Sequence, residues 1–84
     1  MSERTVAVLP IQRAVATASP SAWSDAMVMC AGDGSVTLAH LDGRVSELLT
    51  GAPATVGSPV AFHPVAEVLS VDGAWFSARA VLAA

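Results

Sequence analysis

The sequence predicts an all-β fold, in the form of a small antiparallel barrel or sandwich. Short apolar runs alternate with turn-forming residues at spacings of about 8 to 12 residues, and Asp-Gly pairs separate several of these runs. The chain has 84 residues, which suits a single domain, residues 1–84, with one small core.

Residues 1–20 are predicted to form an N-terminal arm, because Pro10 and Pro20 interrupt this part of the chain. Residues 5–9 are rich in β-branched side chains and suit an extended strand. A loop or a single helical turn is expected over residues 19–25.

Residues 11–18 fit two structures. Apolar side chains recur there at helical spacing, at Ile11, Ala14, Val15 and Ala18. The segment also has the length of a strand. We predict an extended conformation, with one short helix as the alternative.

The middle of the chain is predicted to be a three-stranded meander, with strands at residues 26–31, 35–41 and 44–49. Asp33–Gly34 and Asp42–Gly43 occupy its two turns, and Asp-Gly is typical of type I′ turns, which need positive φ at both central residues. Both faces of the second strand are largely apolar. One face can therefore fill the core, while the other needs a second cover.

Residues 44–49 have a rival interpretation as a helix. Asp42 could cap it, Gly51 could end it and Pro53 lies beyond. The Asp-Gly turn before these residues favours a strand, which is the structure we predict.

The C-terminal half is predicted to contain a turn-rich connector at residues 50–59, strands at residues 60–63, 65–71 and 74–82, and a third Asp-Gly turn at Asp72–Gly73. Pro64 is expected to mark a bend or a sheet edge. From Val56 onward, the sequence VGSPVAFHPVAEVLSVDGAWFSARAV most suggests an SH3-like rolled sheet.

The composition indicates a protein that associates with other subunits. Apolar residues make up 54% of the chain and charged residues 13%, well below the roughly 25% of an ordinary soluble domain. Much apolar surface must therefore remain on the outside, and we expect neighbouring subunits to cover part of it.

Charge and apolar patterning exclude several classes of partner. The four cations are scattered arginines and the net charge is −3, which argues against nucleic acid. No uninterrupted apolar run is long enough to span a membrane. The single cysteine fits synthesis in a reducing compartment, so we expect a cytoplasmic location before assembly.

Cys30, His40 and Asp42 could be written as a nucleophilic site, since a cysteine paired with a histidine can perform covalent catalysis. A strand cysteine in an apolar run is more often a buried small hydrophobe. We therefore expect Cys30 to be buried and no residue to be catalytic.

The histidines do not predict a metal site, because no short-spaced pair of ligands exists. We expect His63, which precedes Pro64, to be a structural residue at a bend, and His40 to be a partly exposed strand residue. No cofactor and no metal is expected.

Residues Gly32–Ser35 have the look of a phosphate-binding glycine loop, but the required spacing and the lysine are missing. Calcium ligands at the usual spacing are missing too. We expect a hairpin tip at this position.

The aromatic residues suggest where a partner would bind. Trp75 and Phe76 are adjacent and point to opposite faces of a strand, so one of them leaves the main core. We predict Phe76 inside, with Trp75 or Trp23 outside as an interface anchor. The predicted interface residues are Val6, Val8, Trp23, Trp75, Val81 and Leu82.

In style, the whole chain resembles the small all-β structural proteins of tailed-phage virions, of the neck or head-completion, tail-tube and capsid-decoration types. The features that carry this resemblance are Ala- and Val-rich strands with Asp-Gly turns, the connector TGAPATVGSP and the segment VGSPVAFHPVAEVL. The resemblance implies a non-enzymatic subunit of a virion, with other copies or a major structural protein as its partners.

The N-terminal arm, Ser2–Leu9, and the C-terminal strand, Ala74–Ala84, would then be the contact elements. The alternative is a small cytoplasmic β-barrel module whose edge strand or mouth binds a peptide or a metabolite.

Overall fold

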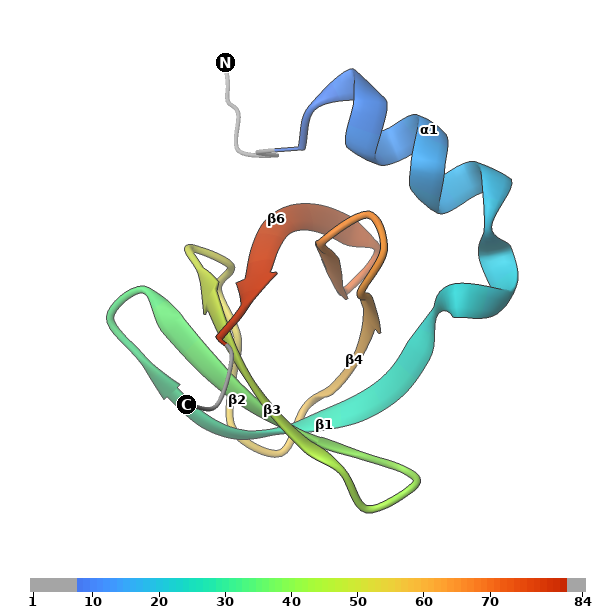
Figure 1. The fold of residues 1–84 in the computed structure, drawn as a ribbon. Coiled ribbons are helices and arrows are strands. Elements are labelled where there is room, and N and C mark those ends of the chain that lie inside the picture. Colours follow the sequence, from blue (N-terminus) through green and yellow to red (C-terminus); the bar gives the residue numbers. More distant parts are fainter. Residues whose placement is uncertain (1–7, 82–84) are drawn as a thin grey trace.

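Six antiparallel strands close into a barrel in the computed structural model, which describes residues 8–81, and one helix lies on the outside of the barrel (Figure 1). The elements are α1 (Pro10–Ala18), a 3₁₀ turn η1 (Pro20–Ala22), β1 (Ser24–Gly32), β2 (Ser35–His40), β3 (Val45–Thr50), β4 (Pro59–His63), β5 (Val68–Val71) and β6 (Ala74–Ala80). Around the barrel the strand order is β1-β2-β3-β6-β5-β4. The predicted all-β class is confirmed, and the sheet closes as a barrel.

The predicted meander is confirmed as β1, β2 and β3. Leu38 of β2 pairs with Val28 on one side and Ser46 on the other, which aligns the inward-facing side chains of the three strands. Residues 45–50 are a strand, so the helical alternative for this segment is wrong.

The three Asp-Gly turns differ from one another. Asp72 and Gly73 both have positive φ, 51° and 80°, as a type I′ turn requires. Within residues 8–81, Glu67 is the other non-glycine residue with positive φ, so type I′ geometry is wrong for the other two pairs. The Gly43 amide donates to the His40 carbonyl, and the His40 amide donates to the Arg44 carbonyl. These two hydrogen bonds are typical of a three-residue hairpin loop with a bulge.

The extended conformation predicted for residues 11–18 is wrong, because these residues form α1. Pro10 occupies the first helical turn, where the missing N–H costs nothing. The Gln12 side chain accepts a hydrogen bond from the Leu9 amide at 2.8 Å and so caps the start of the helix. Pro20 prevents continuation, and η1 follows where a loop or single turn was predicted.

The strand predicted over residues 65–71 begins only at Val68. Residues 64–67 form a turn in which Glu67 has a φ of 57°. Side chains from other elements form hydrogen bonds with the backbone of this turn. The alternation of apolar residues along the sequence does not predict such contacts.

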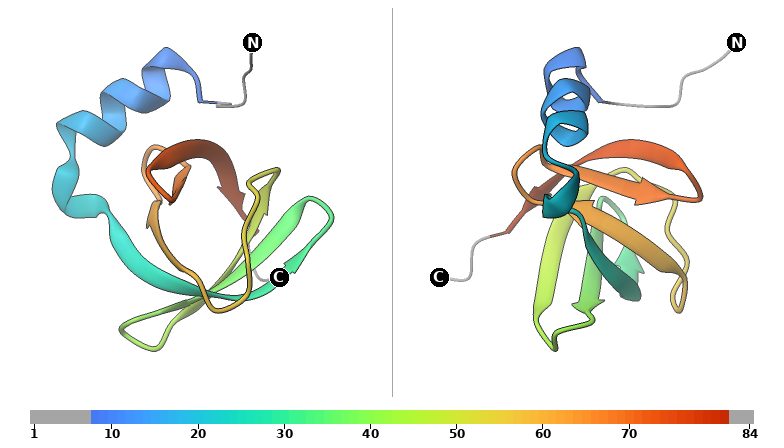
Figure 2. Two further views of the ribbon diagram at one scale, coloured as in Figure 1. Left: turned by 180° about the vertical axis from the view of Figure 1, so that it is seen from behind. Right: turned by 90° about the vertical axis from the view of Figure 1, so that its right-hand side faces the viewer.

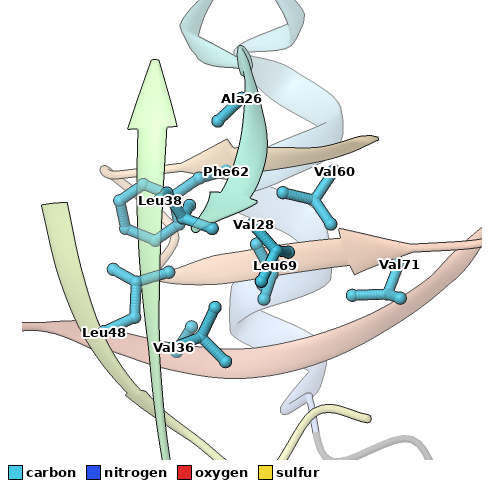
Figure 3. Packing of buried hydrophobic residues seen from close by; sticks show 10 residues of the cluster. Ala26, Val28, Val36, Leu38, Leu48, Val60, Phe62, Leu69 and Val71 are labelled. Atoms are coloured by element: carbon cyan, nitrogen blue, oxygen red, sulfur yellow. The ribbon is translucent and has the colours of Figure 1, made fainter. Parts of the chain in front are cut away.

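The barrel interior holds the main core. Ten buried residues meet there, of which Figure 3 shows the packing: Ala26, Val28, Val36, Leu38, Leu48, Val60, Phe62, Leu69, Val71 and Ala78. Phe76, predicted to point inward, is partly buried against this cluster.

A second, smaller cluster lies between the barrel wall and α1. Its buried members are Ala16, Ala66 and Val68, with Trp23 and Trp75 packed against them. Val68 and Leu69 are both 0% exposed although they are neighbours in β5. Adjacent strand residues point to opposite faces, so β5 is covered on both sides: by the barrel interior and by the helix.

The meander lies on the side of the barrel away from α1 (Figure 2). Among residues 8–81, no helix packs on the outer face of the meander, whereas the sheet around β5 is covered by α1 (Figure 2). The apolar middle strand was expected to need a cover on its second face. That second face is the outer face of β1–β3, and α1 does not cover it.

Candidate functional site

The predicted interface residues fall into three groups. Trp23, Trp75 and Val8 pack against the cluster beneath α1. Val81 is exposed at the end of β6, where its amide donates to the Glu47 carbonyl.

Val6 and Leu82 lie outside the described residues, and so do most of the N-terminal arm and the last residues of the C-terminal contact element.

The two tryptophans form one aromatic group with His63. The Trp23 and Trp75 ring centroids are 5.2 Å apart, and Trp23 meets the His63 ring edge-on at 5.1 Å. The Arg13 guanidinium of α1 lies 4.9 Å from the centroid of Trp75, a cation–π contact. Trp75 does leave the barrel core, but it turns toward the chain's own helix.

Gln12 fastens α1 to the barrel. Its side-chain amide lies 3.2 Å from the Ala66 carbonyl, 3.1 Å from the Glu67 carbonyl and 3.2 Å from Ser77 Oγ. One side chain therefore links the helix to the 64–67 turn and to β6. A single glutamine in an eight-residue apolar segment gave no sequence signal for this role.

His63 is a buried structural residue at a bend, as predicted. Its Nε2 lies 2.9 Å from the Ser19 carbonyl oxygen, and its Nδ1 accepts the Ala66 amide at 3.0 Å. A carbonyl can only accept and a backbone amide can only donate, so the ring is the neutral tautomer protonated at Nε2. The imidazole therefore joins the end of α1 to the turn after β4.

His40 is buried, which corrects the prediction of a partly exposed residue. Its ring lies between two hydroxyls, with Ser24 Oγ 3.0 Å from Nδ1 and Ser46 Oγ 2.8 Å from Nε2. Both serines come from neighbouring strands, so the three side chains form a polar layer across β1, β2 and β3. Each ring nitrogen has a partner, and the layer satisfies a buried histidine.

A serine beside a histidine can also act as a nucleophile and its base. The usual third group, a carboxylate that orients the ring, is replaced here by the Ser24 hydroxyl.

An open depression of about 300 Å³ lies on the surface, lined by Asp25, Pro59, Val60, Ala61, Ser70 and Asp72. Its lining includes none of the three residues of the polar layer, Ser24, His40 and Ser46.

Cys30 is exposed, which overturns the expected burial. In β1, Val28 pairs with Leu38 but Cys30 pairs with Thr37, so Met29 is an extra residue that forms a β-bulge. The bulge shifts the alternation by one position and turns the thiol outward, beside the exposed Met29. Sequence alternation alone predicts that Cys30 faces the core, because the position of a bulge cannot be predicted from the alternation of apolar residues.

An apolar row crosses the outer face of the meander. Met27 pairs with Pro59 of β4 and with Ala39 of β2, and Ala39 pairs with Val45 of β3. Met27 is 52% exposed and Val45 60%. Four strands therefore contribute one apolar residue each to a continuous line that faces away from the core, which we call the outer row.

Charged residues flank the outer row on both sides. Glu47 and Arg44 of the β3 region are exposed, as is Asp25 of β1. Beyond them, Leu49 pairs with Arg79 of β6. The face thus has an apolar centre and a rim that carries both signs of charge.

No three His, Cys, Asp or Glu residues within 8–81 are grouped as a metal site requires. Over the same residues, no helix has the length and apolar character needed to cross a membrane.

Comparison of the chain with protein-family models, with curated proteins and with solved structures gives no significant match. The functional interpretation therefore depends on the geometry of the molecule.

Proposed function

We propose that this chain is a non-enzymatic structural subunit that packs into a multi-subunit assembly through the outer face of β1–β3. The observation that carries the proposal is the outer row, in which Pro59, Met27, Ala39 and Val45 form an apolar line across four strands. Exposed apolar patches with a polar rim are typical of protein interfaces.

We propose a second copy of this chain as the occupant of that face. A net charge of −3 gives only weak repulsion between copies, because strong net charge is what keeps proteins apart. The rim carries Glu47 and Asp25 together with Arg44 and Arg79, so two copies can place opposite charges against each other. The resemblance in style to small virion proteins makes a virion, at its neck or capsid surface, our proposed setting.

The chain offers a matched pair of valines for the test. Val45 lies in the outer row and is 60% exposed, whereas Val65 lies in the turn before β5 and is 66% exposed. Val45→Glu and Val65→Glu therefore add the same charge at similar exposure, on and off the proposed interface.

Size-exclusion chromatography with light scattering, over a wide concentration range, should show self-association of the wild-type chain and of Val65→Glu. Val45→Glu should remain a monomer, with a far-ultraviolet circular dichroism spectrum like that of wild type. A wild-type chain that stays monomeric at every concentration would overturn the proposal. Equal loss of association in both variants would also overturn it, because the interface would then lie elsewhere.

A further inference from the structure

The two buried histidines of the chain have different hydrogen-bond partners. His63 is 0% exposed and His40 is 7% exposed. His63 lies between a backbone carbonyl, which can only accept, and a backbone amide, which can only donate. His40 lies between the hydroxyls of Ser24 and Ser46, and each hydroxyl can donate or accept. His40 can therefore take up a second ring proton and keep both hydrogen bonds, whereas His63 cannot.

A second proton on His63 would be placed on Nδ1, the atom that accepts the Ala66 amide at 3.0 Å. Two N–H groups would then point at each other. Turning the ring over does not relieve this clash, because both ring nitrogens would carry hydrogen. The charged ring would also be buried with one N–H lacking an acceptor, which is costly in a site shielded from water. Protonation of His63 therefore breaks its contact with the turn at residues 64–67.

The same turn is the part of the barrel to which α1 is fastened. Gln12 Nε2 lies 3.2 Å from the Ala66 carbonyl and 3.1 Å from the Glu67 carbonyl. Glu67 has a φ of 57°, a conformation that a non-glycine residue keeps only when its surroundings impose it. Loss of the hydrogen bond from Ala66 to His63 frees this turn, and the two carbonyls that hold Gln12 move with it.

Within residues 8–81, the elements around His63 carry four charged side chains: Arg13 of α1, Asp25 of β1, Glu67 of the turn and Arg79 of β6. Arg13 disfavours a second positive charge, since its guanidinium lies 4.9 Å from the Trp75 centroid, within the aromatic group that includes His63. The other three side chains belong to exposed residues, so water and salt screen their charges. The hydrogen bonds of the ring therefore decide its response to a proton.

We propose that His63 is a proton-sensitive latch for α1, which docks the helix while the ring is neutral and releases it when the ring takes up a proton. The docked state excludes the second proton and the open state accepts it, so lowering the pH favours opening. Opening uncovers the outer side of β5, where Val68 is 0% exposed and Trp75 is partly buried. Acidic pH thus exposes an apolar face that is separate from the outer row.

Hydrogen exchange of the full-length chain between about pH 7 and about pH 5 tests the latch, because histidine is the side chain that ordinarily titrates in this range. Protection factors of α1, corrected for the intrinsic pH dependence of exchange, should fall by at least about fivefold. Protection of β2 and β3, on the side of the barrel away from α1, should stay nearly constant (Figure 2). Constant protection of α1, or a parallel loss in these strands, would overturn the proposal.

Two variants, one for each histidine, assign the effect. His63→Gln cannot ionise, so its helix should be less protected than that of wild type at the higher pH and should lose nothing further at the lower pH. His40→Gln leaves His63 in place and should keep the wild-type loss of α1 protection. A pH dependence that survives in His63→Gln, or that disappears in His40→Gln, would contradict the latch.

Ring ¹⁵N shifts of the wild-type chain provide a measurement that needs no substitution. Nε2 of His63 should have the shift of a protonated nitrogen, and Nδ1 that of an unprotonated one, for as long as α1 is protected. A His63 ring that carries both protons while α1 keeps its full protection would show that the helix is held by other contacts, and the latch would not exist. The light-scattering test of assembly concerns the outer row, so the two proposals can fail separately.

Discussion

The imidazole of His63 donates from Nε2 to the backbone carbonyl of Ser19 at 2.9 Å, across 44 positions of the sequence. The same ring accepts the Ala66 amide at Nδ1. One fully buried side chain thus ties the end of α1 to the barrel, and the helix in turn covers the outer side of β5.

Replacing His63 should loosen this connection in a graded way. His63→Leu leaves the Ser19 carbonyl and the Ala66 amide without partners and should lower the free energy of unfolding by about 2 to 4 kcal/mol. His63→Gln keeps an amide group able to serve one of these partners and should cost less. Urea unfolding followed by fluorescence of Trp23, which touches the ring, measures both. Equal stability of His63→Leu and wild type would contradict this role.

The stability of the fold should also depend on the side-chain amide of Gln12, which donates hydrogen bonds to the turn at residues 64–67. Gln12→Glu is nearly isosteric but places a carboxylate against the Ala66 and Glu67 carbonyls, and we expect a loss of about 1 to 3 kcal/mol. Hydrogen exchange should then show faster opening of α1. Thr17→Glu, an exposed position of the same helix, is the control for added charge and should leave the exchange rates close to those of wild type.

Leu48 and Leu49 provide a test of the barrel closure, because β3 presents them to opposite sides. Leu48 is fully buried in the core, whereas Leu49 is 51% exposed. Leu48→Ala should lower the free energy of unfolding by about 2 to 5 kcal/mol. Leu49→Ala should change it by no more than about 0.5 kcal/mol. Denaturant midpoints that are equal for the two variants would mean that the register of β3 is wrong.

Asp42 should titrate below the usual range of an aspartate. The Arg44 backbone amide donates to its carboxylate at 3.0 Å and the Arg44 guanidinium donates at 2.7 Å, and both hydrogen bonds lower the pKa of Asp42. Because the folded pKa is lowered, the contribution to stability is present above the ordinary pKa and disappears as the pH falls through the lowered value.

Carboxyl ¹³C shifts measured against pH test this arrangement. Arg44→Ala should raise the pKa of Asp42 only part of the way to its ordinary value, since the backbone amide, the largest cause, stays in place. Arg79 lies in β6, opposite Leu49 at the far end of β3, so Arg79→Ala should leave the titration curve of Asp42 unchanged. Full recovery of the ordinary pKa in Arg44→Ala would show that the guanidinium, and not the amide, holds the carboxylate.

The fold class and most strands could be predicted from local pattern, because the inward positions of β2 and β3 alternate without interruption. Pro10 and Gln12 are also typical of a helix start. Residues 11–18 have the length of a strand as well, and this length led to the wrong prediction of an extended conformation. The site was less predictable. The row from Pro59 to Val45 exists only after the register aligns four strands, and no position in the sequence marks its neighbours across a sheet.

By itself, the sequence determined the alternating strands, the turns at its Asp-Gly pairs and a surface poor in charge, because these depend on neighbouring residues and on composition. Only the tertiary structure decided the outward position of Cys30, the burial of His40 and the cover of β5 by α1. A bulge shifts the alternation of a strand. A hydrogen bond between strands and a docked helix each join residues that are distant in the chain. Their positions therefore follow from barrel closure and not from local periodicity.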